Sequence, residues 1–219
     1  MRPSKALITP EGYPYIAYSA GLLLFLTAGA FFLKSTALAA PAVLTLLLLL
    51  FVISFFRNPE RVPPADPALV VAPADGTVVY IGPAAQEHLG ACLKISIFMS
   101  VFNVHVNRAP VRGTVVARCY KQGKFYDARH AKASCENEQC GLVMETDSGV
   151  QVAFVQIAGL IARRILCYVD AGDRLERGER YGMIRFGSRV DIFLPEGCEP
   201  LVAVGQTTTA GVTALTRLT

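Results

Sequence analysis

The Gly187-Ser188 step, near the C-terminus, is the pair of residues in this sequence whose types best suit covalent chemistry. It lies between two apolar, strand-like runs in the segment Arg185-Phe-Gly-Ser-Arg-Val-Asp-Ile-Phe-Leu-Pro195. The serine places a hydroxyl beside a glycine carbonyl, the least hindered peptide carbonyl that a protein can offer. Most Gly-Ser pairs simply form turns. The competing interpretation is self-cleavage of the chain, in which the serine becomes part of a prosthetic group.

A second polar region lies within the otherwise apolar run of residues 95–110. In this run Asn103, His105 and Asn107 alternate with apolar residues. Alternate residues of a β-strand share one face, so a strand here would line one face with polar groups, as a site requires. A single histidine in such a setting is more often structural, and these residues alone leave both interpretations open.

The acidic candidate is Asp75, which lies in the segment Pro73-Ala-Asp-Gly76 between two predicted strands. Asp-Gly is a common turn pair. On this segment alone, a plain turn is the simpler interpretation of Asp75.

The N-terminal part of the chain is apolar, and from Tyr13 to Phe56 its only charged residue is Lys34. Two segments, about 14–33 and 37–56, are each long enough to cross a ~30 Å hydrocarbon core at ~1.5 Å per residue. They predict a transmembrane helical hairpin that forms a membrane anchor over residues 1–57. A single span with an interfacial segment is the main alternative. A cleaved signal peptide fits poorly, because the apolar region is long and divided into two parts.

Basic residues flank the hairpin, with Arg2 and Lys5 before it and Arg57 and Arg61 after it. The positive-inside rule therefore predicts that both ends of the hairpin, and the whole C-terminal domain, lie on the cytoplasmic side of the cell membrane. The net charge of +4 suits an anionic lipid surface. It is too small to indicate nucleic-acid binding.

The cysteines and histidines give no metal-binding pattern. The six cysteines include no Cys-x-x-Cys pair, and the three histidines are scattered. Zinc sites need closely spaced ligand pairs, so no metal is expected and the thiols are predicted to be buried or idle in a reducing compartment. A metal shared by Cys135 and Cys140 is the alternative.

The remainder of the chain predicts a mainly β domain. Residues 58–68 are rich in proline and form a stiff connector. Residues 69–219 consist of short runs rich in Val, Ile, Phe and Tyr, separated by Gly, Pro or Asp, with a short helix allowed at 83–89. The expected strands include 69–72, 77–81, 92–98, 113–120, 142–146, 151–157, 165–169, 181–186, 190–194 and 201–204.

A weak internal repeat refines this fold class. Val169-Asp-Ala-Gly172 is followed by Gly178, and Val202-Ala-Val-Gly205 is followed by Gly211 at the same spacing. Both copies predict a strand, a tight turn and another strand. The arrangement resembles the turn units of lipoyl-like barrel-sandwich hybrid folds, and we expect that fold for the β domain that follows the helical hairpin.

Three motifs occur in order behind the hairpin: Pro73-Ala-Asp-Gly76, Asn103-Val-His-Val-Asn-Arg108 and Phe186-Gly-Ser-Arg-Val-Asp191. Each motif is weak alone, but the ordered set resembles the phosphatidylserine decarboxylase proenzymes of the short, pyruvoyl-dependent type. The resemblance extends from about Phe55 to the C-terminus. Its further matches are Phe55-Phe-Arg-Asn-Pro-Glu-Arg61, Lys132-Ala-Ser134 and Asn137-Glu138.

The resemblance implies that the chain cuts itself between Gly187 and Ser188, into a β chain of residues 1–187 and an α chain of residues 188–219. The Ser188 hydroxyl would attack the Gly187 carbonyl, and elimination would then release the β chain. Hydrolysis with loss of ammonia would leave a pyruvoyl group at the new N-terminus. This group, the only cofactor expected, would form a Schiff base with the amine of phosphatidylserine and accept electrons as CO2 leaves, giving phosphatidylethanolamine.

The resemblance also implies roles for the polar candidates. His105, oriented by Asp75, would take the Ser188 proton and later return a proton to the substrate carbon. Longer members of the family carry a second histidine where this chain has Arg108. Arg108 and the adjacent Asn107 are therefore expected to bind the substrate, since a guanidinium suits a carboxylate or phosphate.

The expected partners are the phospholipid substrate in the membrane and the two chains of the same proenzyme, with a homodimer left open and no nucleic acid. Two other functions remain alternatives. One is a non-catalytic, membrane-tethered lipoyl-like adaptor module, and the other is the same chemistry on an archaeal-type, ether-linked serine phospholipid.

Overall fold

The computed structural model describes residues 6–130, 132–160, 164–185 and 187–218. Contacts between Cα atoms divide them into two compact units, which meet in sequence between Glu60 and Arg61. Phe186, which belongs to the Gly-Ser motif, lies outside the described residues.

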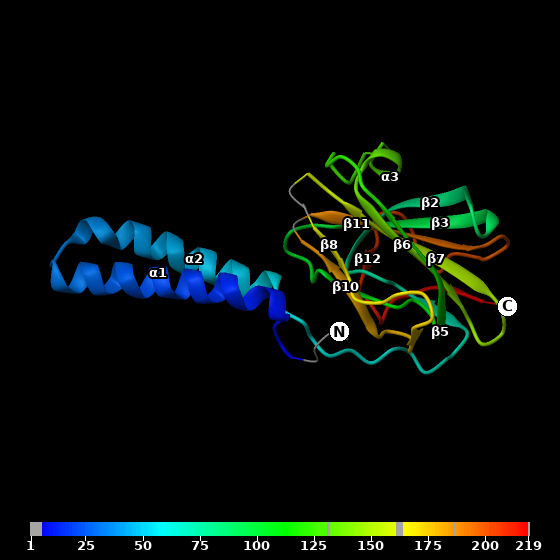
Figure 1. Cartoon of the computed structure of the whole chain (residues 1–219), viewed down its shortest axis with the longest axis horizontal. Helices are drawn as coiled ribbons and strands as arrows, with labels where there is room; N and C mark the ends of the chain where they lie inside the picture. The colour runs from blue at the N-terminus through cyan, green and yellow to red at the C-terminus, as the bar shows by residue number, and fades with distance from the viewer. Residues whose placement is uncertain (1–5, 131, 161–163, 186, 219) are drawn as a thin grey trace. The chain divides into compact units, whose positions relative to one another are not determined.

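The N-terminal unit is a pair of α-helices, α1 (Tyr13–Phe32) and α2 (Ala39–Phe55), drawn in blue in Figure 1. Short 3-10 turns, η1 (Pro10–Gly12) and η2 (Thr36–Leu38), precede them. The helical segments, 10–32 and 36–55, are long and apolar enough to cross a membrane. Most of their large apolar side chains are exposed, as expected for helices that meet lipid rather than a protein core.

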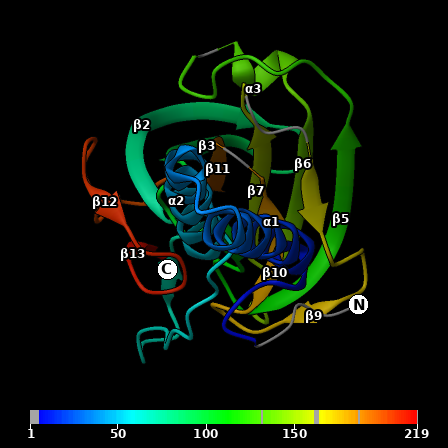
Figure 2. The same cartoon turned by 90° about the vertical axis from the view of Figure 1, so that its left-hand side faces the viewer.

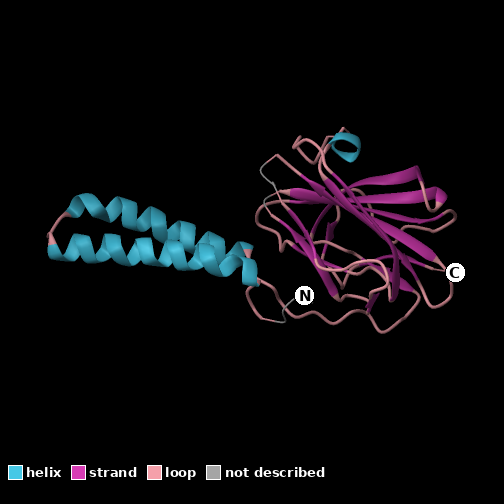
Figure 3. Ribbon diagram, in the orientation of Figure 1, coloured by secondary structure: helices cyan, strands magenta, loops and turns pink. Residues whose placement is uncertain are grey.

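The second unit is built almost entirely of strands, and its helix α3 (Ala133–Glu136) is a single turn (Figure 3). Its largest sheet has the strand order β12-β2-β3-β11-β7-β6-β5-β9. Smaller sheets have the orders β4-β10-β8 and β1-β13. The strands are β1 (Leu69–Val71), β2 (Gly76–Gln86), β3 (Gly90–Met99), β4 (Val106–Arg108), β5 (Gly113–Lys121), β6 (Gln139–Glu145), β7 (Gln151–Ala158), β8 (Ile165–Cys167), β9 (Arg174–Leu175), β10 (Arg180–Ile184), β11 (Ser188–Pro195), β12 (Thr207–Thr208) and β13 (Ala214–Arg217).

The large sheet curls into a half-barrel, with β2 and β5 arching along opposite flanks (Figure 2). One buried apolar cluster draws residues from all three sheets, for example Val70 of β1, Ile97 of β3 and Tyr181 of β10. On the central strand β11, Val190 and Ile192 belong to this cluster. Because side chains alternate along a strand, Ser188 faces the same side as these two residues.

The two halves of the β unit repeat one arrangement. Gly172 donates its N–H to the Val115 carbonyl, and Gly205 donates its N–H to the Val78 carbonyl, both at 2.8 Å. Val115 and Val78 lie next to corresponding bulges in β5 and β2. The repeat seen in the sequence is therefore a structural repeat.

The second glycine of each pair also makes an equivalent hydrogen bond in the two halves. Gly178 donates to the Ala109 carbonyl and Gly211 donates to the Ala72 carbonyl, again at 2.8 Å. Both glycines have a positive φ, of 78° and 76°, which favours glycine. A Cβ on Gly211 would lie 3.4 Å from the Gly178 Cα, so the two turns pack directly on each other.

The mainly β class and the N-terminal helical pair are confirmed, but two local predictions are wrong. Residues 201–204 form bends and a turn instead of a strand. Residues 83–89 are not helical, because β2 continues to Gln86 and pairs with β3. Pro83 is tolerated there because β12 pairs with β2 only at Thr77 and Gly76, which leaves Pro83 on an edge where no N–H is needed.

Candidate active site

Ser188 is the first residue of β11 and is fully buried. It pairs with Met99 of β3 on one side and with Ala158 of β7 on the other. Its hydroxyl donates a hydrogen bond to the Met99 sulfur, with an Oγ–Sδ distance of 3.4 Å. Thioether sulfur is a weak acceptor, so this bond holds the hydroxyl only lightly.

Gly187 gives the Gly-Ser step an unusual backbone shape. Its φ is +65°, in the left-handed region that glycine occupies without a steric penalty. A Cβ on Gly187 would meet no atom within 4 Å, whereas a Cβ on Gly159 would lie 2.2 Å from the Gly187 carbonyl oxygen. The Gly187 carbonyl therefore rests on the backbone of Gly159, a residue that the sequence analysis did not single out.

His105 precedes β4 and is fully buried. Its Nδ1 lies 2.9 Å from the Asn103 carbonyl oxygen. A carbonyl can only accept, so in the neutral ring Nδ1 carries the proton and Nε2 carries the lone pair. The Ile184 N–H donates to the His105 carbonyl at 3.4 Å, which places His105 beside the strand that leads into Gly187.

Asn103 is not part of a strand face. Its side-chain oxygen accepts hydrogen bonds from the N–H and the hydroxyl of Ser100, at 2.8 and 2.9 Å. These bonds close the turn between β3 and β4. Because the Asn103 carbonyl also accepts the His105 bond, Asn103 fixes both the turn and the imidazole.

Asp75 lies in the turn before β2 and forms a nearly buried ion pair with Arg61. Arg61 Nη2 donates to Asp75 Oδ2 at 2.7 Å, and the Ala210 N–H donates to Oδ1 at 2.8 Å. The same turn touches β4, since the Arg108 N–H donates to the Pro73 carbonyl at 2.9 Å. The fold thus brings the Asp75 turn beside the His105 segment, and their acid–base pairing stays a prediction.

Asn107 is fully buried and connects β4 to the Ser188 neighbourhood. Its Nδ2 donates to the Met99 sulfur at 3.6 Å, and its Oδ1 accepts from Gln156 Nε2 at 2.8 Å. Asn107 and Ser188 therefore reach the same thioether. Met99 and Gln156 were not predicted, because neither residue type signals chemistry in the sequence.

Arg108, expected to bind substrate, is 3% exposed and donates from Nη1 to the Gly178 carbonyl at 2.8 Å. A Cβ on Gly211 would approach its Cδ to 2.8 Å. In this structure the Arg108 side chain binds the Gly178 turn and its Cδ lies close to Gly211 of the other repeated turn, and its role toward substrate stays a prediction.

The opposite face of β11 carries a buried charge cluster. Arg189 Nε lies 2.8 Å from Asp191 Oδ1, and Lys94 Nζ lies 3.1 Å from Asp191 Oδ2. The Ser134 hydroxyl accepts a hydrogen bond from Arg189 Nη2 and donates one to Asp191 Oδ2 at 3.3 Å. The cluster ties the residue that follows Ser188 to the polar loop between β5 and β6.

That loop is held near Gly187 and Ser188 by further bonds. Arg189 Nη1 donates to the Ala128 carbonyl at 2.8 Å, and Asn137 Nδ2 donates to the Ala158 carbonyl at 2.7 Å. Hydrogen bonds from the Arg129 side chain lower the pKa of Asp127 to about 2, so the Asp127 carboxylate is ionised at neutral pH. These bonds anchor the loop beside Ser188.

We expect Arg189→Met to destabilise the β unit by about 3–5 kcal/mol, because it leaves the Asp191 carboxylate buried with one fewer partner. Thermal unfolding in detergent micelles measures this loss. The control is Arg129→Met, which removes an exposed ion pair with Asp127 worth about 1 kcal/mol or less. Equal losses in the two variants would show that the cluster does not have the strength assigned to it.

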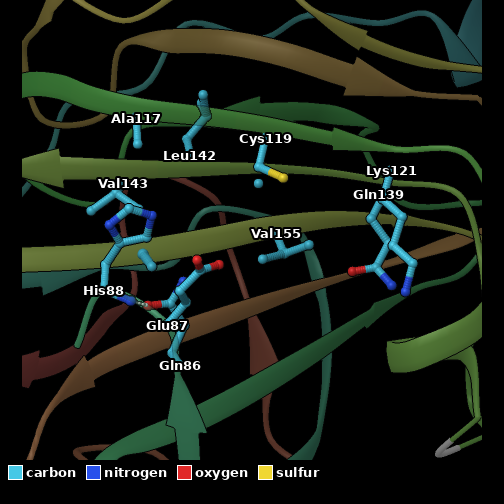
Figure 4. A pocket seen from close by; sticks show the side chains of 12 residues that line it. Gln86, Glu87, His88, Ala117, Cys119, Lys121, Gln139, Leu142, Val143 and Val155 are labelled. Atoms are coloured by element: carbon cyan, nitrogen blue, oxygen red, sulfur yellow. Dashed lines mark hydrogen bonds between the residues drawn. The ribbon is translucent and has the colours of Figure 1, made fainter. Parts of the chain in front are cut away.

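A pocket of about 170 Å³ lies elsewhere on the sheet, under the hairpin that joins β2 and β3 (Figure 4). Glu87 and His88 come from this hairpin, and Ala153 and Val155 come from β7. Ala153 and Val155 alternate with the core residue Phe154, so the pocket opens on the face opposite to Ser188. It is separate from the candidate active site.

The described residues contain no group of three His, Cys, Asp or Glu side chains placed to hold a metal ion. Cys140 and Cys167 do lie together. A hydrogen bond between their thiols lowers the pKa of Cys167 to about 7, while the same bond and burial raise the pKa of Cys140.

Comparisons with a family model and with individual known proteins point to the same family. The family model for phosphatidylserine decarboxylase matches residues 48–216, which is more than half of the chain. The phosphatidylserine decarboxylase proenzyme of Trichlorobacter lovleyi is 83% identical over 218 residues, covering 100% of both chains. Those of Geobacter sulfurreducens and Pelobacter propionicus are 56% and 53% identical and cover 98% and 100% of both chains. The chain belongs to the phosphatidylserine decarboxylase proenzyme family.

Proposed function

We propose that this protein decarboxylates phosphatidylserine to phosphatidylethanolamine and CO2, with a pyruvoyl group made from its own Ser188. Family membership over the whole chain supports the reaction. The structural observation that carries the proposal is Ser188 itself, a buried serine at the start of a central strand behind a left-handed glycine. The non-catalytic adaptor alternative does not fit this family.

The proposed self-cleavage rearranges the bonds of Gly187 and Ser188. A base removes the hydroxyl proton, Oγ attacks the Gly187 carbonyl carbon, and the amide becomes an ester. Loss of the Ser188 α-proton then breaks the Cβ–Oγ bond, and Oγ leaves as part of the Gly187 carboxylate. The candidate base is His105, because its Nδ1–H is held by the Asn103 carbonyl, which leaves the Nε2 lone pair as the atom that can accept a proton.

The fold can hold the product of this cut. After cleavage, residue 188 still begins β11, which pairs with β3 over its whole length and with β7 from Ser188 to Phe193. The α chain also contains β12 and β13, which pair with β2 and β1. The two chains therefore stay in one core without their covalent link, and Arg189 fixes the new N-terminus through the Asp191 cluster.

When formed, the pyruvoyl group supplies a conjugated carbonyl that condenses with the substrate amine and accepts electrons as CO2 leaves. The surrounding residues exclude bulk water, since Met99, Ala158 and Val190 are all buried. His105 is the group proposed to return a proton to the substrate carbon. Asp75, Asn107 and Arg108 remain proposals for orienting His105 and binding the lipid headgroup.

The proposed partner is a phospholipid in a bilayer, which the two apolar helices are long enough to cross. We place the β unit on the cytoplasmic side, because Arg2, Lys5, Arg57 and Arg61 flank the helices and positive residues favour that side. A homodimer and an ether-linked substrate remain open proposals.

Intact-mass measurement of the purified protein tests the function. We expect two chains, residues 1–187 and 188–219, and an α chain that a carbonyl-reactive hydrazide labels at its N-terminus. The same sample should release CO2 from phosphatidylserine in mixed micelles. A preparation that decarboxylates the lipid as one unbroken chain would disprove the assignment of Ser188.

A further inference from the structure

Gln156 is a fully buried amide in the middle of β7. Its Nε2 donates to Asn107 Oδ1 at 2.8 Å, but no donor among the described residues reaches its Oε1. Buried polar atoms almost always have a hydrogen-bond partner. An acceptor left open in an apolar core therefore indicates a small ligand that can donate, and water is the simplest one.

This open acceptor lies close to Ser188. Gln156 pairs with Val190, and Ala158 pairs with Ser188. Gln156 is therefore the diagonal neighbour of Ser188, on the same side of the sheet, with Cα atoms about 7–8 Å apart. A glutamine side chain can span that separation.

The packing around the amide fixes its position. A Cβ on Gly182 would lie 2.9 Å from Gln156 Nε2 and 3.4 Å from Oε1, so strand β10 packs directly against this side chain. Asn107, which pairs with Gly182 across β4 and β10, binds Nε2 and shares the Met99 sulfur with Ser188. A molecule held by Oε1 would therefore stay in one place relative to residue 188.

The chemistry of residue 188 requires a water molecule in this place. Once the Cβ–Oγ bond has broken, residue 188 is a 2-aminoacryloyl group, which tautomerises to an imine. One water must then add to its α-carbon, and one ammonia must leave, to give the ketone. Ser188 is fully buried, so bulk water does not reach it freely.

We propose that Gln156 Oε1, held by Asn107, binds the water that hydrolyses the imine of residue 188 to the pyruvoyl ketone. The amide oxygen accepts one water hydrogen and points a water lone pair toward the α-carbon. The inference rests on the proposed function, because it concerns the last step in making the pyruvoyl group. Gln156 acts through the water and is a positioning residue.

The test uses Gln156→Met, which keeps the length of the side chain but removes the oxygen. The full-length chain is synthesised in a cell-free system with lipid nanodiscs, and samples are reduced with borohydride while still folded. Reduction turns an imine into an N-terminal alanine and a ketone into an N-terminal lactyl group, and the intact mass of the α chain separates the two. We expect normal cutting after Gly187 but ketone formation slower by about ten-fold or more, which is the effect of one hydrogen bond of ~1.4 kcal/mol.

Two further variants sharpen the result. Gln156→Glu retains an acceptor oxygen and should restore ketone formation relative to Gln156→Met. The control Gln151→Met, in the same strand, removes a partly exposed amide that bonds Glu145 at 3.1 Å and should behave as wild type.

Formation of the ketone at the wild-type rate in Gln156→Met would overturn the proposal. So would a Gln156→Met chain that stays uncut while Gln156→Glu is cut, since the amide would then act before the hydrolysis. A wild-type chain that never forms a ketone would instead overturn the proposed function.

Discussion

Replacing Ser188 with alanine is expected to leave a single uncut chain with no decarboxylase activity. The variant lacks the oxygen that must attack the Gly187 carbonyl, and no pyruvoyl group can form from alanine. Its fold should be intact, because the lost hydrogen bond runs to a thioether at 3.4 Å and such a bond contributes no more than about 1 kcal/mol. Intact mass, thermal unfolding and CO2 release from phosphatidylserine check these three statements.

The informative comparison for this variant is with wild type in the same micelles. If Ser188→Ala unfolds at the wild-type temperature and stays uncut, the loss of activity belongs to the chemistry and not to the fold. A Ser188→Ala chain that is cut after Gly187 would show that another residue provides the nucleophile.

The fold class could be predicted from the sequence because the patterns that mark strands and turns are local. Apolar runs separated by glycine and proline mark strands, and the two glycine pairs mark turns whose hydrogen bonds repeat in the structure. The strand predicted at residues 201–204 was wrong because an apolar run can also cover the core in a bent, irregular conformation. The short strands β9 and β12 have two residues each, too few to produce a pattern.

The site was only partly predictable, because its chemical residues have recognisable types and its supporting residues do not. Ser188 and His105 could be selected from the sequence, and the structure buries both of them. Arg61 could be assigned only a place beside the membrane, although it is the residue that pairs with Asp75. Such a contact depends on tertiary packing between residues that are distant in the sequence, and no local pattern records it.

Gly159 is another residue whose tertiary contact no local sequence pattern records. A single glycine after a strand usually indicates a turn. In the structure, a Cβ at this position would lie 2.2 Å from the Gly187 oxygen and 3.0 Å from its carbonyl carbon. The Gly187 carbonyl, which Ser188 must attack, can therefore keep its position only because residue 159 has no side chain.

We expect Gly159→Ala to slow self-cleavage by about 100-fold or more, because a displacement of roughly 1 Å at a reacting group costs that much. The overlap must push the Gly187 carbonyl away from its position beside Ser188. Overpacking of this kind lowers the free energy of unfolding by about 1–3 kcal/mol, so the protein should still fold. The rate of conversion from one chain to two, followed by intact mass after cell-free synthesis, measures the effect.

Gly141→Ala is the matched control for this prediction. Gly141 lies in the neighbouring strand β6, where a Cβ would meet Val155 Cγ2 at 3.5 Å and the Cys119 carbonyl oxygen at 3.8 Å, which are ordinary contacts. It should cut at the wild-type rate. If Gly159→Ala also cut at that rate, the Gly187 carbonyl would not need the support of Gly159. If both variants were slow, the effect would belong to loss of glycine in general, and the geometry assigned to the Gly187-Ser188 bond would be wrong.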